Sequence, residues 1–178
     1  WLNRVWNLVL QKHQGSSSPD ANAVKDLKRV MHKTIRKVTD DYERFRFNTM
    51  VAAMMEYTNY LSRVREAGSV DASSWREAAD ALLLLLAPTT PHLAEELWVR
   101  TGHPYSIHNQ RWPKWDEELA REDEITLVVQ VNGKVRDKLV VPASVTEEQA
   151  RDLVLNQARV KAHLEGKQVR KVIYVPGR

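Results

Sequence analysis

The sequence predicts a multi-domain chain: an all-α helical bundle followed by a small α+β domain. Apolar residues recur at helical spacing through the first 113 residues, whereas apolar and polar residues alternate, as in a β-strand, from about residue 125. Residues 114–124 hold two basic and six acidic side chains, a composition typical of a solvated linker. We therefore expect a helical domain over residues 1–113, an acidic linker over 114–124 and an α+β domain over 125–178.

Five helices are expected in the first domain from the spacing of their apolar residues. They cover residues 1–13, 21–39, 48–66, 74–87 and a short segment from 91 to 101. Asn48 and the pair Thr90-Pro91 are residue types typical of helix starts. The fourth segment is apolar on nearly every side and should lie at the centre of the bundle. Residues 102–124 show no regular period, and we expect Trp112 and Trp115 to hold their middle part against the bundle.

The small domain is expected to open with a β-hairpin. The pair Asn132-Gly133 between two apolar-rich runs is typical of a tight turn. A two-residue loop would mix apolar and charged side chains on each face, whereas a three-residue loop over 131–133, with its glycine left-handed, separates them. Because burial of one face sets the register of a hairpin, we expect the three-residue loop. In that register Asp137 is the one polar residue on the apolar face.

Two helical segments and a strand complete the predicted small domain. The segment Thr146-Glu-Glu-Gln149 has the pattern of a capping box, which predicts a helix that ends near Asn156. A helical turn over residues 160–165 should end at Gly166, because glycine commonly terminates helices. Residues 169–175 are expected to form a last strand.

Composition argues against several classes of function. The 178-residue chain has no cysteine, hence no disulfide and no thiolate metal site. Its densest apolar run, residues 78–87, is far shorter than the roughly 20 residues of a membrane span, and its start lacks the pattern of a signal peptide. We expect a cytoplasmic monomer without membrane contact. Because no Gly-rich phosphate loop, zinc-ligand spacing or nucleophile elbow is found, we expect no catalytic residue, metal or cofactor in this chain.

Basic residues gather in two places. The net charge is +4, but residues 125–178 hold ten basic against five acidic residues, and the second predicted helix has a basic face with few acidic residues. Ten side chains are candidates for contact with RNA phosphates: Lys25, Arg29, Lys33 and Arg36 on the second helix, Lys134, Arg136 and Lys138 in one row on the hairpin, and Lys167, Arg170 and Lys171 near the last strand. The alternatives are a solvated helix face and a charged edge strand that blocks aggregation. Because only Tyr174 lies among the cations of the small domain, we expect them to contact the RNA backbone rather than stack on bases.

Several stretches resemble a known family. VQVNGKVRDK over residues 129–138 and VRKVIYVPGR over 169–178 are similar to the carboxy-terminal domain of bacterial-type leucyl-tRNA synthetases. RVW at residues 4–6, FNTMVAAMMEYTN over 47–59 and LAPTTPHLAEELW over 86–98 resemble the anticodon-binding helical domain of class I synthetases. The last of these is shared with the valyl, isoleucyl and methionyl enzymes. The resemblance covers essentially the whole chain, and its hairpin and terminal segments favour leucine.

The resemblance implies a function. Enzymes of this family join leucine to tRNA(Leu) using ATP and magnesium, and an inserted editing domain hydrolyses mischarged products. The HIGH and KMSKS signatures of catalysis are absent, so the chain resembles a non-catalytic fragment that accompanies the catalytic and editing domains of a longer parent. In this family the helical domain lies along the inner side of the tRNA and the small domain reaches the tRNA elbow. The alternatives are the same domain pair from a valyl- or isoleucyl-type synthetase and a protein-interaction module with acidic partners.

Overall fold

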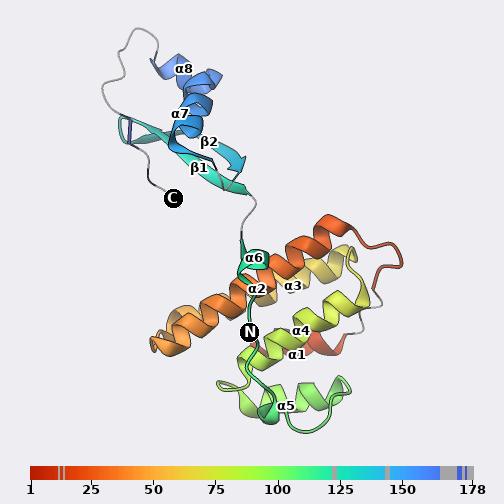
Figure 1. Cartoon of the computed structure of the whole chain (residues 1–178). Coiled ribbons are helices and arrows are strands. Elements are labelled where there is room, and N and C mark those ends of the chain that lie inside the picture. The colour runs from red at the N-terminus through yellow and green to blue at the C-terminus, as the bar shows by residue number, and fades with distance from the viewer. Residues whose placement is uncertain are drawn as a thin grey trace. The chain divides into compact units, whose positions relative to one another are not determined.

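The computed structural model describes residues 1–11, 13, 15–121, 124–142, 145–164, 172, 173 and 175. The chain forms two compact units, residues 1–121 and 122–178 (Figure 1). The first unit is helical and the second contains a β-hairpin followed by two helices, which confirms the predicted fold class. Within the described part of the chain, no helix is both long and apolar enough to cross a membrane.

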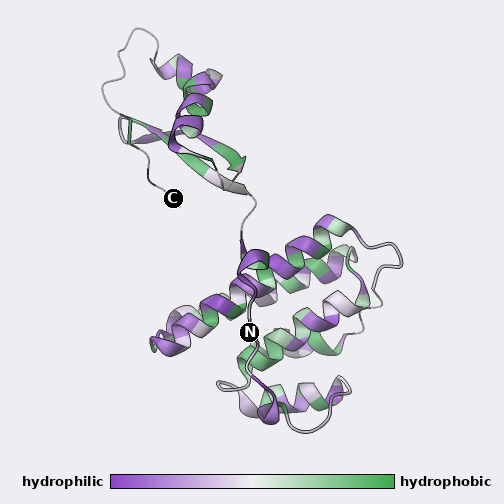
Figure 2. Ribbon diagram, viewed as in Figure 1, coloured by the Kyte–Doolittle hydropathy of each residue, from purple (hydrophilic) through white to green (hydrophobic). Residues whose placement is uncertain are grey.

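The helical unit is organised around α4. Its elements are α1 (Leu2–Leu10), α2 (Ala21–Glu43), α3 (Phe47–Ala67), α4 (Ala72–Leu86), α5 (Pro91–Arg100), the 3-10 helix η1 (Ile107–Asn109) and α6 (Glu117–Ala120). α4 contacts α2, α3 and α5, and it buries Ala78, Leu82 and Leu86 completely. Figure 2 shows hydrophobic residues concentrated along the carboxyl-terminal half of α4. The prediction of a central fourth helix is therefore confirmed.

Helix starts differ in how they are capped. The Asp71 side chain accepts a hydrogen bond from the Ser74 backbone N–H at 2.8 Å and caps α4. Asn48 lies inside α3, whose N-cap position is held by Arg46 without a side-chain bond, so the prediction of an Asn48 cap is wrong. The pair Thr90-Pro91 opens α5 as predicted, although the Thr90 hydroxyl donates to the Leu86 carbonyl instead of capping α5.

The segment after α5 packs against the helical unit over most of its length. Trp112 Nε1 donates a hydrogen bond to Thr39 Oγ1 at 2.8 Å, and Trp112 and Trp115 pack against the bundle core, as predicted. α6 contacts α2, and its Ala120 is 3% exposed. The prediction of a linker is therefore wrong for residues 114–121. The many acidic residues of α6 suggested a fully solvated segment, but one side of this short helix is buried.

The second unit opens with a hairpin made of β1 (Glu124–Val131) and β2 (Lys134–Pro142). Asn132 and Gly133 have φ values of 51° and 75°, the two left-handed conformations that a type I′ turn requires. The loop therefore has two residues, and the prediction of a three-residue loop is wrong. Asparagine tolerates the left-handed region better than most residues, which makes the tighter turn accessible.

A β-bulge follows the turn. Gln130 pairs with Val135 and Val129 pairs with Asp137, which leaves Arg136 as the surplus residue of β2. This insertion shifts the alternation of β2 by one position. Beyond the bulge, Leu127, Leu139 and Val141 lie on the face that packs on Ala150, whereas Val128 and Val140 lie on the other face and are exposed. The predicted separation of apolar and polar faces is therefore only partly correct.

Two helices complete the described part of the small unit, α7 (Glu147–Asn156) and α8 (Ala158–Leu164). The predicted capping box is confirmed: the Gln149 N–H donates to Thr146 Oγ1 at 3.3 Å, and the Thr146 N–H donates to Gln149 Oε1 at 3.1 Å. α8 contacts β2. Val172 and Ile173 carry no strand pairing, and most of the predicted strand over 169–175, like Gly166, lies outside the described residues.

Candidate nucleic-acid interface

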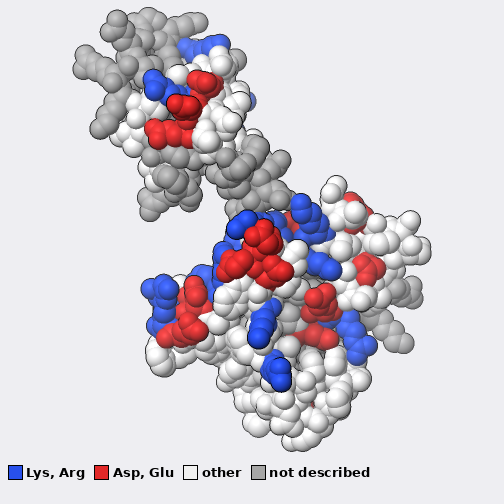
Figure 3. All heavy atoms as spheres, in the orientation of Figure 1, with Lys and Arg blue, Asp and Glu red and all other residues white. Residues whose placement is uncertain are grey.

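One face of α2 carries the four predicted helical contacts. Lys25, Arg29, Lys33 and Arg36 are spaced by four, four and three residues, so they lie along one side of the helix. Another side of α2 faces the core through fully buried Leu27. Lys25 and Lys33 are exposed, whereas Arg29 and Arg36 are half-buried. Figure 3 shows Lys and Arg side chains interspersed with Asp and Glu side chains over α2 and α6.

Acidic side chains pair with both arginines of this face. Arg29 Nε donates to Asp26 Oδ1 at 3.2 Å, and Arg36 lies 2.9 Å from Glu117 Oε2 of α6. The sequence shows Asp26 on this helix, and the structure adds Glu117 from α6 as a second acidic partner of the basic face. The spacing of Asp26 and Arg29 is visible in the sequence as an i,i+3 pair, but the second pair depends on the packing of α6 on α2, which no local pattern shows.

Hydrogen bonds keep these two carboxylates ionised. Burial raises the pKa of Asp26, but hydrogen bonds from Arg29 and Tyr60 outweigh it, and the pKa lies below its ordinary value. The Tyr60 hydroxyl donates to Asp26 Oδ2 at 2.7 Å. A hydrogen bond from the Trp115 indole, aided by Arg36, lowers the pKa of Glu117. At neutral pH both carboxylates therefore carry their charge and balance part of the positive face of α2.

The three cations of the hairpin are exposed but do not form one row. Residues paired across antiparallel strands share a face of the sheet. Lys134 pairs with Val131 and Lys138 pairs with Val128, and these two positions lie on opposite faces because the bulge at Arg136 separates them. All three basic side chains are exposed. The prediction of a single basic row is therefore wrong, although its expectation of exposed cations holds.

Asp137 finds a partner that the sequence did not predict. Arg159 of α8 lies 3.6 Å from Asp137 Oδ1, so the acidic residue of β2 is matched from a helix more than 20 positions later. Long-range packing of α8 on β2 creates this pair, and no spacing rule could have found it. The candidate contacts Lys167, Arg170 and Lys171 lie outside the described residues.

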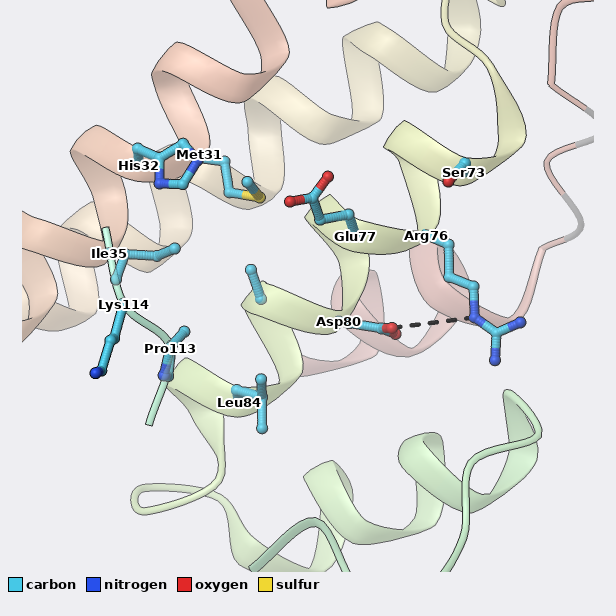
Figure 4. A pocket seen from close by; sticks show the side chains of 11 residues that line it. Met31, His32, Ile35, Ser73, Arg76, Glu77, Asp80, Leu84, Pro113 and Lys114 are labelled. Atoms are coloured by element: carbon cyan, nitrogen blue, oxygen red, sulfur yellow. Dashed lines mark ion pairs between the residues drawn. The ribbon is translucent and has the colours of Figure 1, made fainter. Parts of the chain in front are cut away.

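A hollow of about 430 Å³ lies between α2, α4 and the segment that follows η1 (Figure 4). Arg76 and Asp80 of α4 line one end at an N–O distance of 4.0 Å, and Pro113 and Lys114 line the other. Its charged side chains have both signs. Among the described residues, no group of three or more His, Cys, Asp or Glu is placed to hold a metal ion.

Comparison with known proteins identifies relatives of the whole chain. Residues 25–151 match a family model described as the anticodon-binding domain of tRNA ligase. The leucine–tRNA ligase of Dehalococcoides mccartyi is 52% identical over 178 residues, which are 100% of this chain and 22% of that protein. The leucine–tRNA ligase of Rubrobacter xylanophilus is 50% identical over the same 178 residues, which are 21% of that protein. The chain thus spans about a fifth of the length of the relatives it matches.

A solved structure agrees with these sequences. The chain resembles the LeuRS of Agrobacterium radiobacter in the crystal structure of its ternary complex with tRNA and LeuAMS. The TM-score is 0.82 and the sequence identity is 32%. The alignment covers 99% of this chain and 23% of that protein. Both units described above therefore have counterparts in a protein crystallised with tRNA.

Proposed function

The chain belongs to the family of anticodon-binding domains of tRNA ligases, and on that premise we propose that it is the tRNA-binding carboxy-terminal part of a leucine–tRNA ligase. The observation that carries the proposal is the 50–52% identity to leucine–tRNA ligases over all 178 residues. That similarity extends through the small unit, beyond the residues that the family model matches. It therefore favours leucine over valine and isoleucine as the amino acid of the parent enzyme.

In this proposal the chain binds and positions tRNA(Leu) and does no chemistry itself. The cations of α2 meet phosphates along the inner side of the tRNA, and the cations on one face of the hairpin, with Lys167, Arg170 and Lys171, meet phosphates at the elbow. Each contact releases condensed counterions, which supplies affinity without reading sequence. Binding at two separate places orients the acceptor end of the tRNA toward an active site elsewhere in the parent.

The rest of the parent supplies the reaction. Its catalytic domain binds ATP and magnesium and attaches leucine to the tRNA, and its editing domain hydrolyses mischarged products. The parent works as a monomer in the cytoplasm. The two arginines of α2 contribute less to binding than their number suggests, since Arg29 and Arg36 already neutralise Asp26 and Glu117.

Titration of the chain with tRNA(Leu) at several salt concentrations tests this proposal. Six phosphate contacts predict a log–log slope of roughly −5, at about −0.9 per contact with duplex. Competition with tRNA(Val) and tRNA(Ile) tests the choice of amino acid, and a polyglutamate chain controls for binding to any polyanion. A slope near zero, or equal displacement by polyglutamate, would favour a module for acidic protein partners and contradict the proposal.

A further inference from the structure

The turn between α2 and α3 places a phenylalanine where helices normally place glycine. Phe45 has a φ of 55°, in the left-handed region that bulky side chains rarely adopt. Its N–H donates to the Tyr42 carbonyl at 3.1 Å, and the Arg46 N–H donates to the Asp41 carbonyl at 2.8 Å. These are the two hydrogen bonds of a Schellman motif, in which glycine is the usual left-handed residue.

The same unit contains the motif in its ordinary form. Gly102 has a φ of 89° and ends α5, where its N–H donates to the Val99 carbonyl at 3.0 Å and the next N–H donates to the Trp98 carbonyl at 3.2 Å. Gly68 ends α3 with a φ of 60°. The left-handed position is therefore occupied by glycine at the ends of α3 and α5 and by phenylalanine at the end of α2.

Burial does not compensate for this departure. The Phe45 side chain is 78% exposed, so it gains little of the hydrophobic stabilisation that a phenylalanine usually brings. The backbone conformation at this position works against the folded state, and the exposed side chain does little to offset it. Folding alone therefore gives no reason for a phenylalanine here, and an unfavourable backbone conformation of this kind points to a function.

Neighbouring rings hold Phe45 in place. Its ring lies edge-to-face with that of Phe47, with centroids 6.0 Å apart. Phe47 in turn contacts Tyr42 at 6.4 Å, and Tyr42 contacts Trp112 at 5.4 Å. The four rings form a continuous aromatic ladder from the bundle surface to the tip of the turn. Such edge-to-face contact supports Phe45 from one side and leaves most of its ring open to solvent.

The charge around the tip is basic. Arg44 and Arg46 flank Phe45 in sequence, and both are exposed. One exposed acidic residue, Glu43, lies at the end of α2, and the buried Asp41 is already paired with Lys37, so the two arginines leave the tip with a net positive charge. An exposed ring with an exposed arginine on each side in sequence suits a nucleotide, whose base has a π-face and whose phosphates carry negative charge.

We propose that Phe45 is a stacking platform for an unpaired base of the bound RNA, with Arg44 and Arg46 contacting the phosphates on either side. This inference rests on the proposed tRNA-binding function and adds to it a base contact in the helical unit, where the predicted cations contact only the backbone. The aromatic ladder orients the ring before RNA binds, so little side-chain freedom is lost on binding. Loss of a base–aromatic stack typically weakens binding roughly 5- to 150-fold.

Substitution of Phe45 gives a test in which stability and binding move in opposite directions. Phe45→Gly should raise the melting temperature of the chain, since glycine adopts a φ of 55° without the strain of a Cβ, and should weaken tRNA(Leu) binding roughly 5- to 150-fold. Phe45→Trp should keep the affinity. Tyr105→Leu is the matched control, because Tyr105 is 80% exposed in the same unit and has no arginine beside it in sequence; its binding should be unchanged.

Phe45→Leu separates RNA from the rival occupant, an apolar surface of another protein domain. Leucine preserves apolar contact but has no π-face, so its affinity for tRNA should fall almost as far as that of Phe45→Gly. Equal affinity of wild type, Phe45→Leu and Phe45→Gly would overturn the stacking platform while leaving the salt-dependent binding of the chain intact. Absence of tRNA binding by the wild-type chain would instead remove the proposed function and this inference together.

Discussion

His103 Nε2 lies 2.9 Å from Asp80 Oδ2 and so joins the segment after α5 to the central helix α4. The His103 ring also stacks on Trp98 with centroids 3.8 Å apart, and Thr101 Oγ1 lies 3.2 Å from its other ring nitrogen. Burial raises the pKa of Asp80, and the charge and hydrogen bond of His103 oppose that effect. This contact therefore stabilises a carboxylate that the bundle has partly removed from water.

We predict that His103→Ala destabilises the helical unit by about 2 kcal/mol, because it leaves Asp80 without its hydrogen-bond partner and exposes Trp98. Asp80→Asn should cost less, since the amide can still hydrogen-bond and carries no charge to desolvate. Urea unfolding of the two variants at one pH measures both values. A loss below about 0.5 kcal/mol for His103→Ala, the range of ordinary surface changes, would contradict the assigned role.

Acid is predicted to weaken the end of α2 through Asp41. This residue is 1% exposed and pairs with Lys37. Burial raises the pKa of Asp41, but hydrogen bonds from Lys37 and Thr49 and the charges of Lys37 and Arg46 outweigh it, so the pKa lies below its ordinary value. A carboxyl whose pKa is lower in the folded state contributes stability that is fully present above its unfolded pKa and is lost as the pH falls through the folded value.

Asp41→Asn measures that contribution. The difference in free energy of unfolding between wild type and variant should be largest near pH 7 and should begin to shrink below about pH 4, where the carboxyl of the unfolded chain binds a proton; it should be lost as the pH falls further and the folded carboxyl is protonated too. The neighbouring Asp40→Asn, at a more exposed position, is the control and should show a smaller change. A difference that stays constant from neutral to acid pH would show that the charge of Asp41 has no part in it.

The ion pair between α2 and α6 leads to a prediction of tighter binding. Glu117→Gln removes the partner of Arg36, so the guanidinium becomes available to RNA phosphate and affinity for tRNA(Leu) at low salt should rise roughly twofold. Glu118→Gln is the matched control, because Glu118 lies on the same helix and pairs with Arg121 at 3.0 Å. If the two variants tighten binding equally, the effect is one of net charge and Arg36 is not a contact.

Local sequence patterns correctly predicted the features of the fold that depend on interactions between residues close together in the chain. The capping box at Thr146 and the apolar run of α4 involve residues within a turn or two of one another, and both were correct. The burial of α6 depends on how distant segments pack, and the bulge at Arg136 depends on how two strands pair; both were missed. The candidate contacts were identified as basic and exposed, but pairing of Arg36 with Glu117 is invisible without the fold.

The bulge at Arg136 leads to unequal roles for the hairpin cations. Lys134 and Lys138 lie on opposite faces of the sheet, so one RNA surface cannot contact both directly. Lys134→Ala, Arg136→Ala and Lys138→Ala combined should make the salt slope less negative by at most about 1.8, which corresponds to two contacts, with the melting temperature nearly unchanged. Of the two lysines, one should account for most of the loss when each is changed alone.

Arg159→Ala provides the contrast to these substitutions. Arg159 is also a cation of the small unit, but it pairs with Asp137. Arg159→Ala should alter the salt slope less than substitution of whichever lysine, Lys134 or Lys138, contacts the RNA, because Asp137 already balances the charge of Arg159. Equal effects of Lys134→Ala and Lys138→Ala on tRNA binding would mean that the register of β2 does not govern the contact, and the proposed docking of the hairpin by one face would be wrong.

The type I′ turn is testable at its two central residues. Gly133 has a φ of 75°, and a Cβ added to it would meet no atom within 4 Å, so Gly133→Ala should cost about 1 kcal/mol through the backbone alone. Asn132→Gly should be neutral or slightly stabilising, whereas Asn132→Val should destabilise, because a β-branched residue resists the left-handed conformation. Hydrogen exchange of the hairpin amides measures each change. A three-residue loop would require the left-handed conformation only at Gly133, so tolerance of valine at Asn132 would contradict the two-residue turn and the bulge that follows from it.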